Sequence, residues 1–170
     1  MRCLSMSICA LLLTATGASA LDQSVSNKKV SLPAEKDLIV GHQASQGRAI
    51  LVELVPGGET VQNYSRMVTL QTAPDLGNVP ENAFLQEFAD RYTAACPKTT
   101  VTKVPMGQKG ATGLRLDCPR HPKTNKLETV FVRAFDLGTD LGIVQITMRY
   151  FPMPVDGEWA RDYLGRVTVQ

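Results

Sequence analysis

Alternating apolar and polar positions along much of the chain predict β-strands. In the segment 48–55, the side chains of Ile50, Val52 and Leu54 fall on one side of an extended chain and would face a core. The same period of two recurs further along, and glycine or proline bounds most of these runs. The further segments that we expect to form strands are 65–71, 99–104, 114–118, 127–137 and 143–151. The pattern therefore predicts a β-rich domain whose strands have a buried face.

Two segments instead repeat apolar residues at the three- and four-residue steps of a helix. In the first, these residues are Phe84, Leu85, Phe88, Tyr92 and Ala95. Asn78 has the position of an N-cap for this helix, and Glu81 follows at the spacing of a capping box. A shorter helix is expected to begin at Asp156, with Trp159, Tyr163 and Val167 on one stripe.

The order of these elements defines the expected fold class. Strands come first, followed by a helix, further strands and a final helix. We expect an α+β domain with one twisted antiparallel sheet and two helices packed on it. The element order from Leu38 to Val169 resembles the Mog1/PsbP-like arrangement, which also occurs in small bacterial envelope proteins. The resemblance has no residue motif and implies a binding or assembly role rather than catalysis.

The first 20 residues have the organisation of a secretion signal. Arg2 supplies the positive charge, an apolar run follows from Ile8 to Leu13, and Ala18-Ser19-Ala20 suits signal peptidase. We therefore expect cleavage after Ala20 and a secreted or periplasmic protein. No later apolar run approaches the roughly 20 residues that a transmembrane helix needs. Cys3 and Cys9 do not follow the apolar run, as a lipid-bearing cysteine would.

The remaining chain divides into a short arm and one domain. Residues 21–36 are polar and show no periodicity, which predicts a flexible N-terminal arm. Residues 37–170 have the length of one ordinary domain.

Only two cysteines, Cys96 and Cys118, remain after the expected cleavage. Two thiols in an oxidising compartment predict one disulfide, which would tie the end of the first helix to a strand. The pair lacks the C-x-x-C spacing of redox-active thiols, and we therefore interpret it as structural.

Positive and negative charges nearly balance over the whole chain, but one segment is strongly basic. Loss of Arg2 reduces the 18 Lys and Arg residues to 17, against 16 Asp and Glu, which argues against a nucleic-acid binder. Between residues 98 and 126, however, the only acid is Asp117. The basic residues there are Lys98, Lys103, Lys109, Arg115, Arg120, Lys123 and Lys126. This segment is the predicted contact surface for a partner protein or an anionic envelope component, although exposed lysines also serve to prevent strand-edge pairing.

The chain contains two histidines, neither of which belongs to a recognisable catalytic or metal-binding motif. His42 precedes Ser45 by three residues in a glycine-flanked segment that a turn between strands explains. His121 follows Cys118 closely, but a cysteine in a disulfide supplies no thiolate for a metal. We therefore predict no cofactor, no metal and no catalytic residue.

Carboxylates offer no clear catalytic pair either. Asp136 and Asp140 lie in an expected hairpin turn, where aspartate is favoured for its backbone hydrogen bonds. Glu53 and Glu128 occupy strand positions that we expect to face water. Glycoside hydrolysis needs two acids that face one cleft.

These observations favour an exported, non-catalytic binding or accessory protein of the cell envelope. Two alternatives belong to other classes. One is an inhibitor or immunity-type protein that inserts a loop, 105–110 or 119–126, into the active site of another protein. The other is a small secreted hydrolase that uses His42 or His121.

Overall fold

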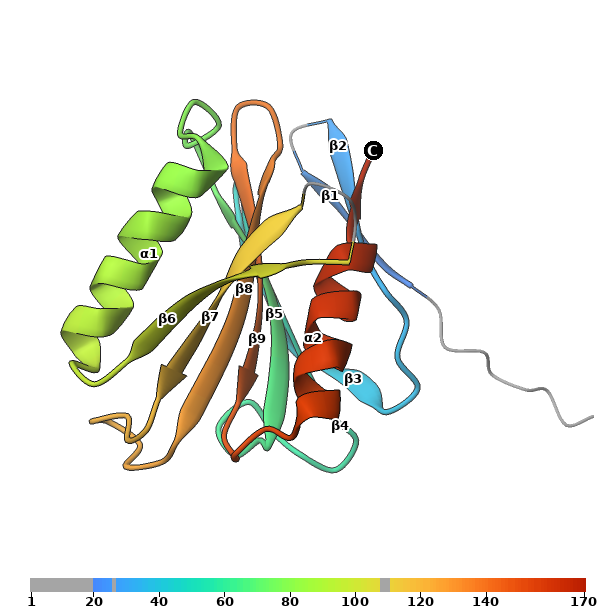
Figure 1. Cartoon of the computed structure of the whole chain (residues 1–170). Coiled ribbons are helices and arrows are strands. Elements are labelled where there is room, and N and C mark those ends of the chain that lie inside the picture. The colour runs from blue at the N-terminus through green and yellow to red at the C-terminus, as the bar shows by residue number, and fades with distance from the viewer. Residues whose placement is uncertain (1–19, 26, 108–110) are drawn as a thin grey trace, which may run out of the picture.

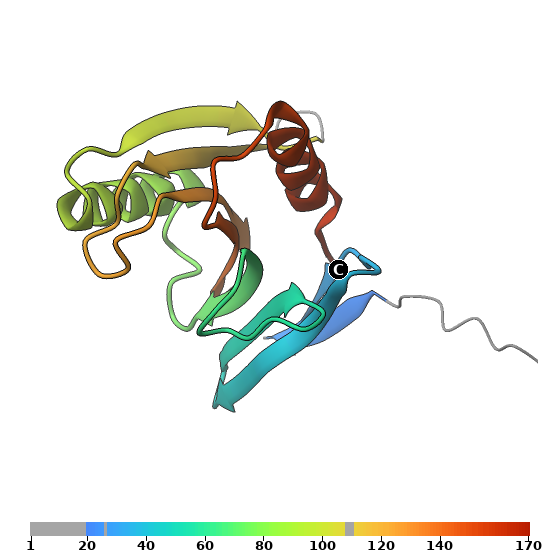
Figure 2. The same ribbon diagram turned by 90° about the horizontal axis from the view of Figure 1, so that it is seen from below.

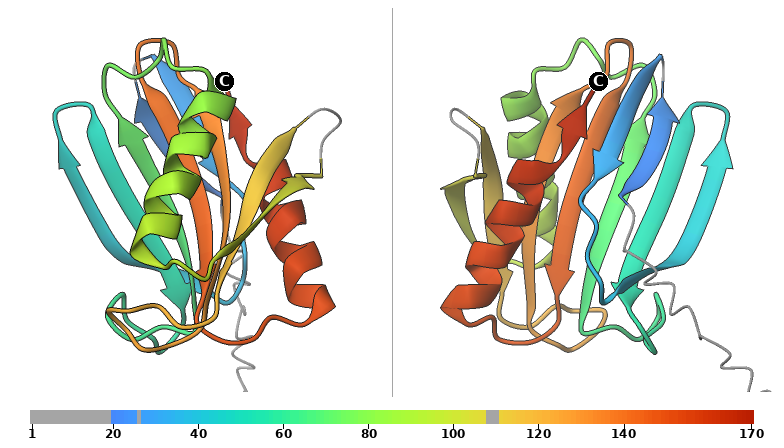
Figure 3. Two further views of the ribbon diagram at one scale, coloured as in Figure 1. Left: turned by 60° about the vertical axis from the view of Figure 1, so that its left-hand side comes forward. Right: turned by 90° about the vertical axis from the view of Figure 1, so that its right-hand side faces the viewer.

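A seven-stranded antiparallel sheet forms the centre of the molecule (Figure 1). The computed structural model describes residues 20–25, 27–107 and 111–170, so that the predicted signal segment before Ala20 lies outside it. In spatial order the strands are β3 (Leu38–Gln46), β4 (Ala49–Pro56), β5 (Arg66–Ala73), β9 (Leu141–Met148), β8 (Glu128–Asp136), β7 (Thr112–Cys118) and β6 (Thr100–Pro105). The two outermost strands, β3 and β6, lie at opposite edges (Figure 3).

The two helices, α1 (Glu81–Ala95) and α2 (Pro154–Arg166), cover opposite faces of the sheet (Figure 2). Strand β8 shows why two cores form, because successive side chains of a strand point to opposite faces. Val130 and Val132 pack in the core that contains α1, whereas Phe131 packs in the core that contains α2. The predicted α+β class, with two helices packed on an antiparallel sheet, is confirmed.

A second, three-stranded sheet replaces the predicted flexible arm. It consists of β1 (Leu21–Val25), β2 (Lys28–Leu32) and β10 (Thr168–Val169), in the order β1-β2-β10. Val25, Val30 and Leu32 are buried in the core that α2 shares with the large sheet. The prediction of a loose arm for residues 21–36 is wrong because these apolar side chains are covered by elements distant in sequence, the last strand among them.

The ends of the helices also differ from the expected ones. Helix α1 begins after Pro80 rather than at Asn78, and the carboxylate of Glu81 accepts a hydrogen bond from the backbone N–H of Asp136 at 3.1 Å. Helix α2 begins after Met153, and Asp156 accepts a hydrogen bond from the N–H of Met153 at 2.8 Å. Glu81 thus connects the start of α1 to the end of β8, and Asp156 caps the start of α2 from its first turn.

Two contacts fix the helices on the sheet. The predicted disulfide between Cys96 and Cys118 is present, with an S–S distance of 2.06 Å, and it ties the end of α1 to β7. Met106 and Gly107, which directly follow β6, lie against the last turn of α2. A Cβ atom on Gly165 would lie 2.3 Å from the carbonyl oxygen of Met106, so only glycine permits this approach. The result is a fixed distance between α2 and the β6–β7 edge.

None of the helices within the described part of the chain is long and apolar enough to cross a membrane.

Candidate functional site

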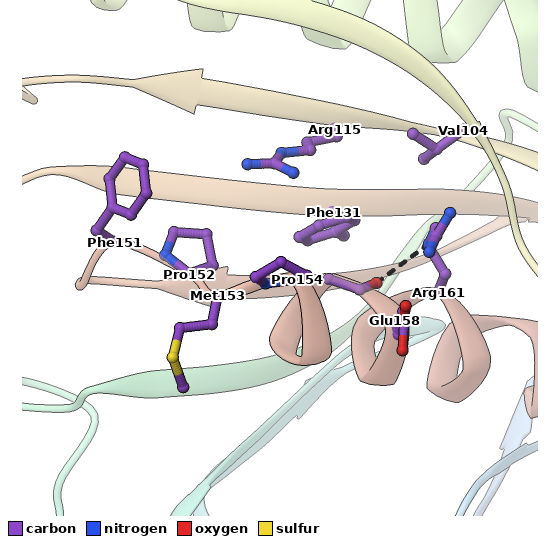
Figure 4. A pocket seen from close by; sticks show the side chains of 10 residues that line it. Val104, Arg115, Phe131, Phe151, Pro152, Met153, Pro154, Glu158 and Arg161 are labelled. Carbon is purple, nitrogen blue, oxygen red and sulfur yellow. Dashed lines mark hydrogen bonds between the residues drawn. The ribbon is translucent and has the colours of Figure 1, made fainter.

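A cleft lies on the α2 face of the sheet, between the start of α2 and strands β6 to β8 (Figure 4). It consists of two adjoining cavities of about 410 and 330 Å³, which share Arg115, Phe151 and Pro152. The first cavity extends along α2 to Arg161, and the second extends toward Lys98 and the disulfide. We refer to the two cavities together as the α2 cleft.

Arg115 occupies the middle of the α2 cleft in a fixed orientation. Its guanidinium forms two hydrogen bonds to Asp117, Nε to Oδ2 at 2.8 Å and Nη2 to Oδ1 at 3.0 Å. Its Cζ lies 5.5 Å from the centre of the Phe131 ring, at the floor of the cleft. Asp117 also accepts a hydrogen bond from the hydroxyl of Thr129 at 2.8 Å. An arginine held in this way presents its remaining N–H groups to a carboxylate at little entropic cost.

The first turns of α2 form the opposite wall of the cleft. Gly157 lies against Phe131, since a Cβ atom at this position would be 3.6 Å from the ring. Glu158 and Arg161 line the wall, and Nε of Arg161 donates a hydrogen bond to the carbonyl of Gly157 at 3.2 Å (Figure 4). The floor is therefore apolar, and the walls carry charges of both signs.

Large apolar side chains at the rim of the cleft face water. Phe151 is 81% exposed and Met153 is 63% exposed. Prolines at 152 and 154 restrict the backbone around them, and Asp156 holds the segment by accepting a hydrogen bond from the hydroxyl of Tyr150 at 3.1 Å. Isolated exposed apolar residues are common, but a group beside a cleft is typical of an interaction site.

The predicted basic residues do not form one surface. Lys98 and Arg115 line the α2 cleft, whereas Lys103 lines a cavity on the other face of the sheet. Arg120, Lys123 and Lys126 lie in the loop between β7 and β8, where Arg120 hydrogen-bonds to Asn125. Lys109 lies outside the described residues.

Several residues of the cleft were not predicted from the sequence. Phe131, Glu158 and Arg161 come from a strand and a helix that are separated along the chain and carry no motif. Phe151 and Met153 had a detectable signal, because two prolines hold these apolar residues between a strand and a helix. The segment 149–153 connects β9 to α2 directly, and the side chains of Phe151 and Met153 stay exposed there.

A buried polar cluster lies on the other face of the sheet, and it corrects the expectation that Glu128 faces water. Glu128 is only 8% exposed. It accepts a hydrogen bond from the hydroxyl of Tyr92 at 2.8 Å, and its other oxygen lies 3.8 Å from Nε of Arg149. The guanidinium of Arg149 in turn stacks on the ring of Tyr64, with Cζ 3.8 Å from the ring centre. The cluster connects α1 to β8 and to the segment before β5.

The four tyrosines predict a loss of stability at alkaline pH. Burial raises the pKa of Tyr64 from 10.0 to about 12, and burial also raises the pKa values of Tyr92, Tyr150 and Tyr163. Unfolded chains ionise their tyrosines near pH 10, before the folded state does, so stability is lost as the pH rises from 10 toward 12. For Tyr64 alone this change corresponds to roughly 3 kcal/mol.

The measurement is a titration that follows tyrosinate absorbance and circular dichroism together. We expect tyrosinate to appear only as the fold is lost. Ionisation near pH 10 with an intact fold would show that these hydroxyls are accessible to solvent.

The structure separates His42 from Ser45, the nearby serine considered for the hydrolase alternative. His42 pairs with Glu53 and Ser45 pairs with Ile50, which places the two side chains on opposite faces of the sheet. His121 lies in the loop between β7 and β8, where its Nδ1 accepts a hydrogen bond from the N–H of Lys123 at 3.3 Å. Among residues 20–25, 27–107 and 111–170, no three or more His, Cys, Asp or Glu side chains form a group that would hold a metal ion.

The two aspartates of the β8–β9 hairpin have separate structural roles. Asp140 is fully buried, and its Oδ1 lies 3.2 Å from Nε of Arg48 and accepts a hydrogen bond from the N–H of Asp75 at 3.1 Å. Asp136 is exposed and accepts a hydrogen bond from the N–H of Gly138 at 2.6 Å. They do not face one cleft.

Comparison with known proteins defines the fold. No protein-family model matches this sequence, and none of the curated proteins matches it either. Among solved structures, a point mutant of the protein Mog1 superposes with a TM-score of 0.52 at 8% identity, covering 89% of this chain and 87% of that one. The Ran-binding protein Mog1p of Saccharomyces cerevisiae gives a TM-score of 0.50 at 8% identity, covering 88% and 87%. The chain therefore has a Mog1-like fold, as the element order had suggested.

Proposed function

We propose that this chain is an exported, non-catalytic binding protein of the cell envelope, and that it takes a segment of a partner protein into the α2 cleft. The single observation that carries this proposal is the exposure of Phe151 and Met153 at the rim of a cleft whose centre is Arg115. Burial of these two side chains would supply binding free energy, and Arg115 would fix a carboxylate of the partner. The apolar floor favours a protein over the surface of an anionic glycan or lipid.

The fold is consistent with a binding role. One of the solved proteins with this fold is described as Ran-binding, so the scaffold serves protein recognition in at least that case. The identity of the partner here does not follow from that likeness, since fold alone does not fix function.

Two features support export. One is the signal-like organisation of the first 20 residues, and the other is the disulfide between Cys96 and Cys118, a bond that persists in oxidising compartments. The test is the intact mass of the protein after expression of the whole chain in a bacterium. We expect a periplasmic product that begins at Leu21 and lacks free thiols. A cytosolic product that retains residues 1–20, or one with free thiols, would contradict export.

The binding role is tested by capture of a partner from envelope extract. We expect the double variant Phe151→Ser and Met153→Ser to reduce the yield of a stoichiometric partner at least about tenfold, because exposed aromatic anchors dominate interface energies. The matched control is Ile39→Ser with Val40→Ser, which changes two apolar residues on β3 that are also about half exposed, at 50% and 47%. Equal losses in both variants, or no loss in either, would remove the cleft from the proposal.

A further inference from the structure

Strand β6 lies at one edge of the large sheet. It crosses from the end of α1 to the end of α2 (Figure 1), and among the described residues β7 is its one neighbour in that sheet. Its residues 100–103 are all exposed. An edge strand of this kind presents backbone N–H and C=O groups that another extended chain can bind.

The register shows which backbone groups of β6 are available. The N–H of Met106 donates to the carbonyl of Ala111 at 3.1 Å, and the same register continues through Val104↔Gly113 and Thr102↔Arg115. In an antiparallel pair, alternate residues bond to the neighbouring strand. The N–H and C=O groups of Val101 and Lys103 are consequently directed away from β7, toward the free edge.

Both faces of this edge border a cavity. On the α2 face, Thr100 and Val104 line the α2 cleft. On the α1 face, Val101 and Lys103 line a separate cavity of about 580 Å³ that extends to Gln86 on α1. A strand laid beside β6 would therefore place alternate side chains over the two cavities, since successive residues of a strand point to opposite faces.

The charges around the edge favour an acidic segment. Lys103 is exposed on the α1 face, and Lys98, Arg115 and Arg161 line the cavities of the α2 face. The acids that line these cavities are Asp117, which is bound to Arg115, and Glu158. Positive charge is thus in excess on both sides of β6.

We propose that β6 binds an extended, acidic segment of the partner protein as an additional strand. Acidic side chains would lie toward Lys103 on one face and toward Arg115 on the other, where apolar side chains would also contact Phe131 and Phe151. The inference rests on the proposed function and specifies how the partner is held. Backbone hydrogen bonds to Val101 and Lys103 would supply affinity, and the two cavities would supply selectivity for alternating side chains.

The other free edge is less suited to this role. The register of β3 against β4 shifts between Val40 and His42, an irregularity of the kind that interrupts edge pairing. A second copy of β6 is also disfavoured as the occupant. Two paired β6 edges would gather both copies of Lys98 and Lys103 in one small area, where like charges repel.

The test uses a short synthetic peptide with the repeat Glu-Glu-Val-Val, which places both residue types on each face of an extended chain. It is titrated into the mature protein while backbone amides are followed by NMR. We expect the largest shifts at Val101 and Lys103, together with shifts at Arg115. Val101→Pro removes an edge N–H that β7 does not use, a substitution that edge strands tolerate. It should weaken binding about tenfold or more, whereas Val101→Thr should change it less than about twofold. Lys103→Glu should also weaken binding.

A second probe keeps the inference testable if Val101→Pro does not fold. The same peptide with its amides N-methylated on the side that faces β6 should not bind the unchanged protein. Unaltered binding of the methylated peptide, or of Val101→Pro, would overturn strand addition. So would shifts confined to the surroundings of Phe151, or association of two protein copies through β6 in sedimentation. The capture experiment with the Phe151 and Met153 variants tests the proposed function by itself. Strand addition at β6 can therefore be wrong while partner binding at the α2 cleft is confirmed, and the reverse.

Discussion

Removal of the disulfide is expected to lower the free energy of unfolding by about 3 kcal/mol. The bond closes a loop with a sequence separation of 22 residues, and the loss of this constraint increases the entropy of the unfolded chain. Alanine is the suitable replacement at both Cys96 and Cys118, because these positions are 2% and 0% exposed and a serine would bury a hydroxyl.

Urea unfolding of the double variant against the unchanged protein gives the measurement. Reduction of the unchanged protein is the internal control and should produce a similar loss of stability. An unaltered unfolding free energy would mean that the bond between α1 and β7 is absent or adds no constraint. Because the same bond fixes Cys118 at the end of the α2 cleft, its loss should also weaken partner capture.

The second large effect is expected at Glu128. Replacement by leucine should lower the unfolding free energy by about 3 kcal/mol, because it leaves the largely buried guanidinium of Arg149 without its carboxylate. The side chain of Arg149 is only 16% exposed, so water does not readily compensate for the loss. Replacing both residues, Glu128→Leu with Arg149→Met, should recover part of the stability, since an apolar pair avoids the cost of burying charge. The hydrogen bond from Tyr92 and the stacking on Tyr64 stay lost in the double variant.

A double-mutant cycle in urea isolates this interaction. The matched control is Glu87→Leu, which removes an exposed ion pair with Arg91 on α1, and should cost no more than about 0.5 kcal/mol. If Glu128→Leu behaves like Glu87→Leu, the buried cluster contributes little. If the double variant is no more stable than Glu128→Leu, the two charges do not act as a pair.

Local patterns were sufficient to predict most of the large sheet. The apolar positions in segments such as 127–137 predict a strand, and strand β8 is present there, but both of its faces are buried in the structure, each in a different core. The first hairpin was missed because its polar residues suggested a solvated arm. Its turn has Asn27 at a φ of 66°, a conformation that asparagine tolerates, but the burial of Val30 and Leu32 depends on β10 at the other end of the chain.

The site was predicted only in part for a similar reason. Arg115 was included among the basic candidates, and the disulfide followed from the cysteine count. Charge along the chain did not reveal that Lys103 and Arg115 lie on opposite faces of the sheet, although strand parity determines it. The contact between Phe131 and α2 depends on packing between segments that are distant in sequence, and no local sequence pattern predicts it.

The central claim is that a partner protein is held in the α2 cleft, and site-specific photo-crosslinking tests it most directly. A photoreactive phenylalanine analogue would replace Phe151 in one sample and Ile39, on the opposite edge of the sheet, in another. We predict one discrete adduct with a single envelope protein from position 151, mapped to an acidic segment, and none from position 39. An adduct from position 39 alone, or equal adducts from both positions, would contradict the account.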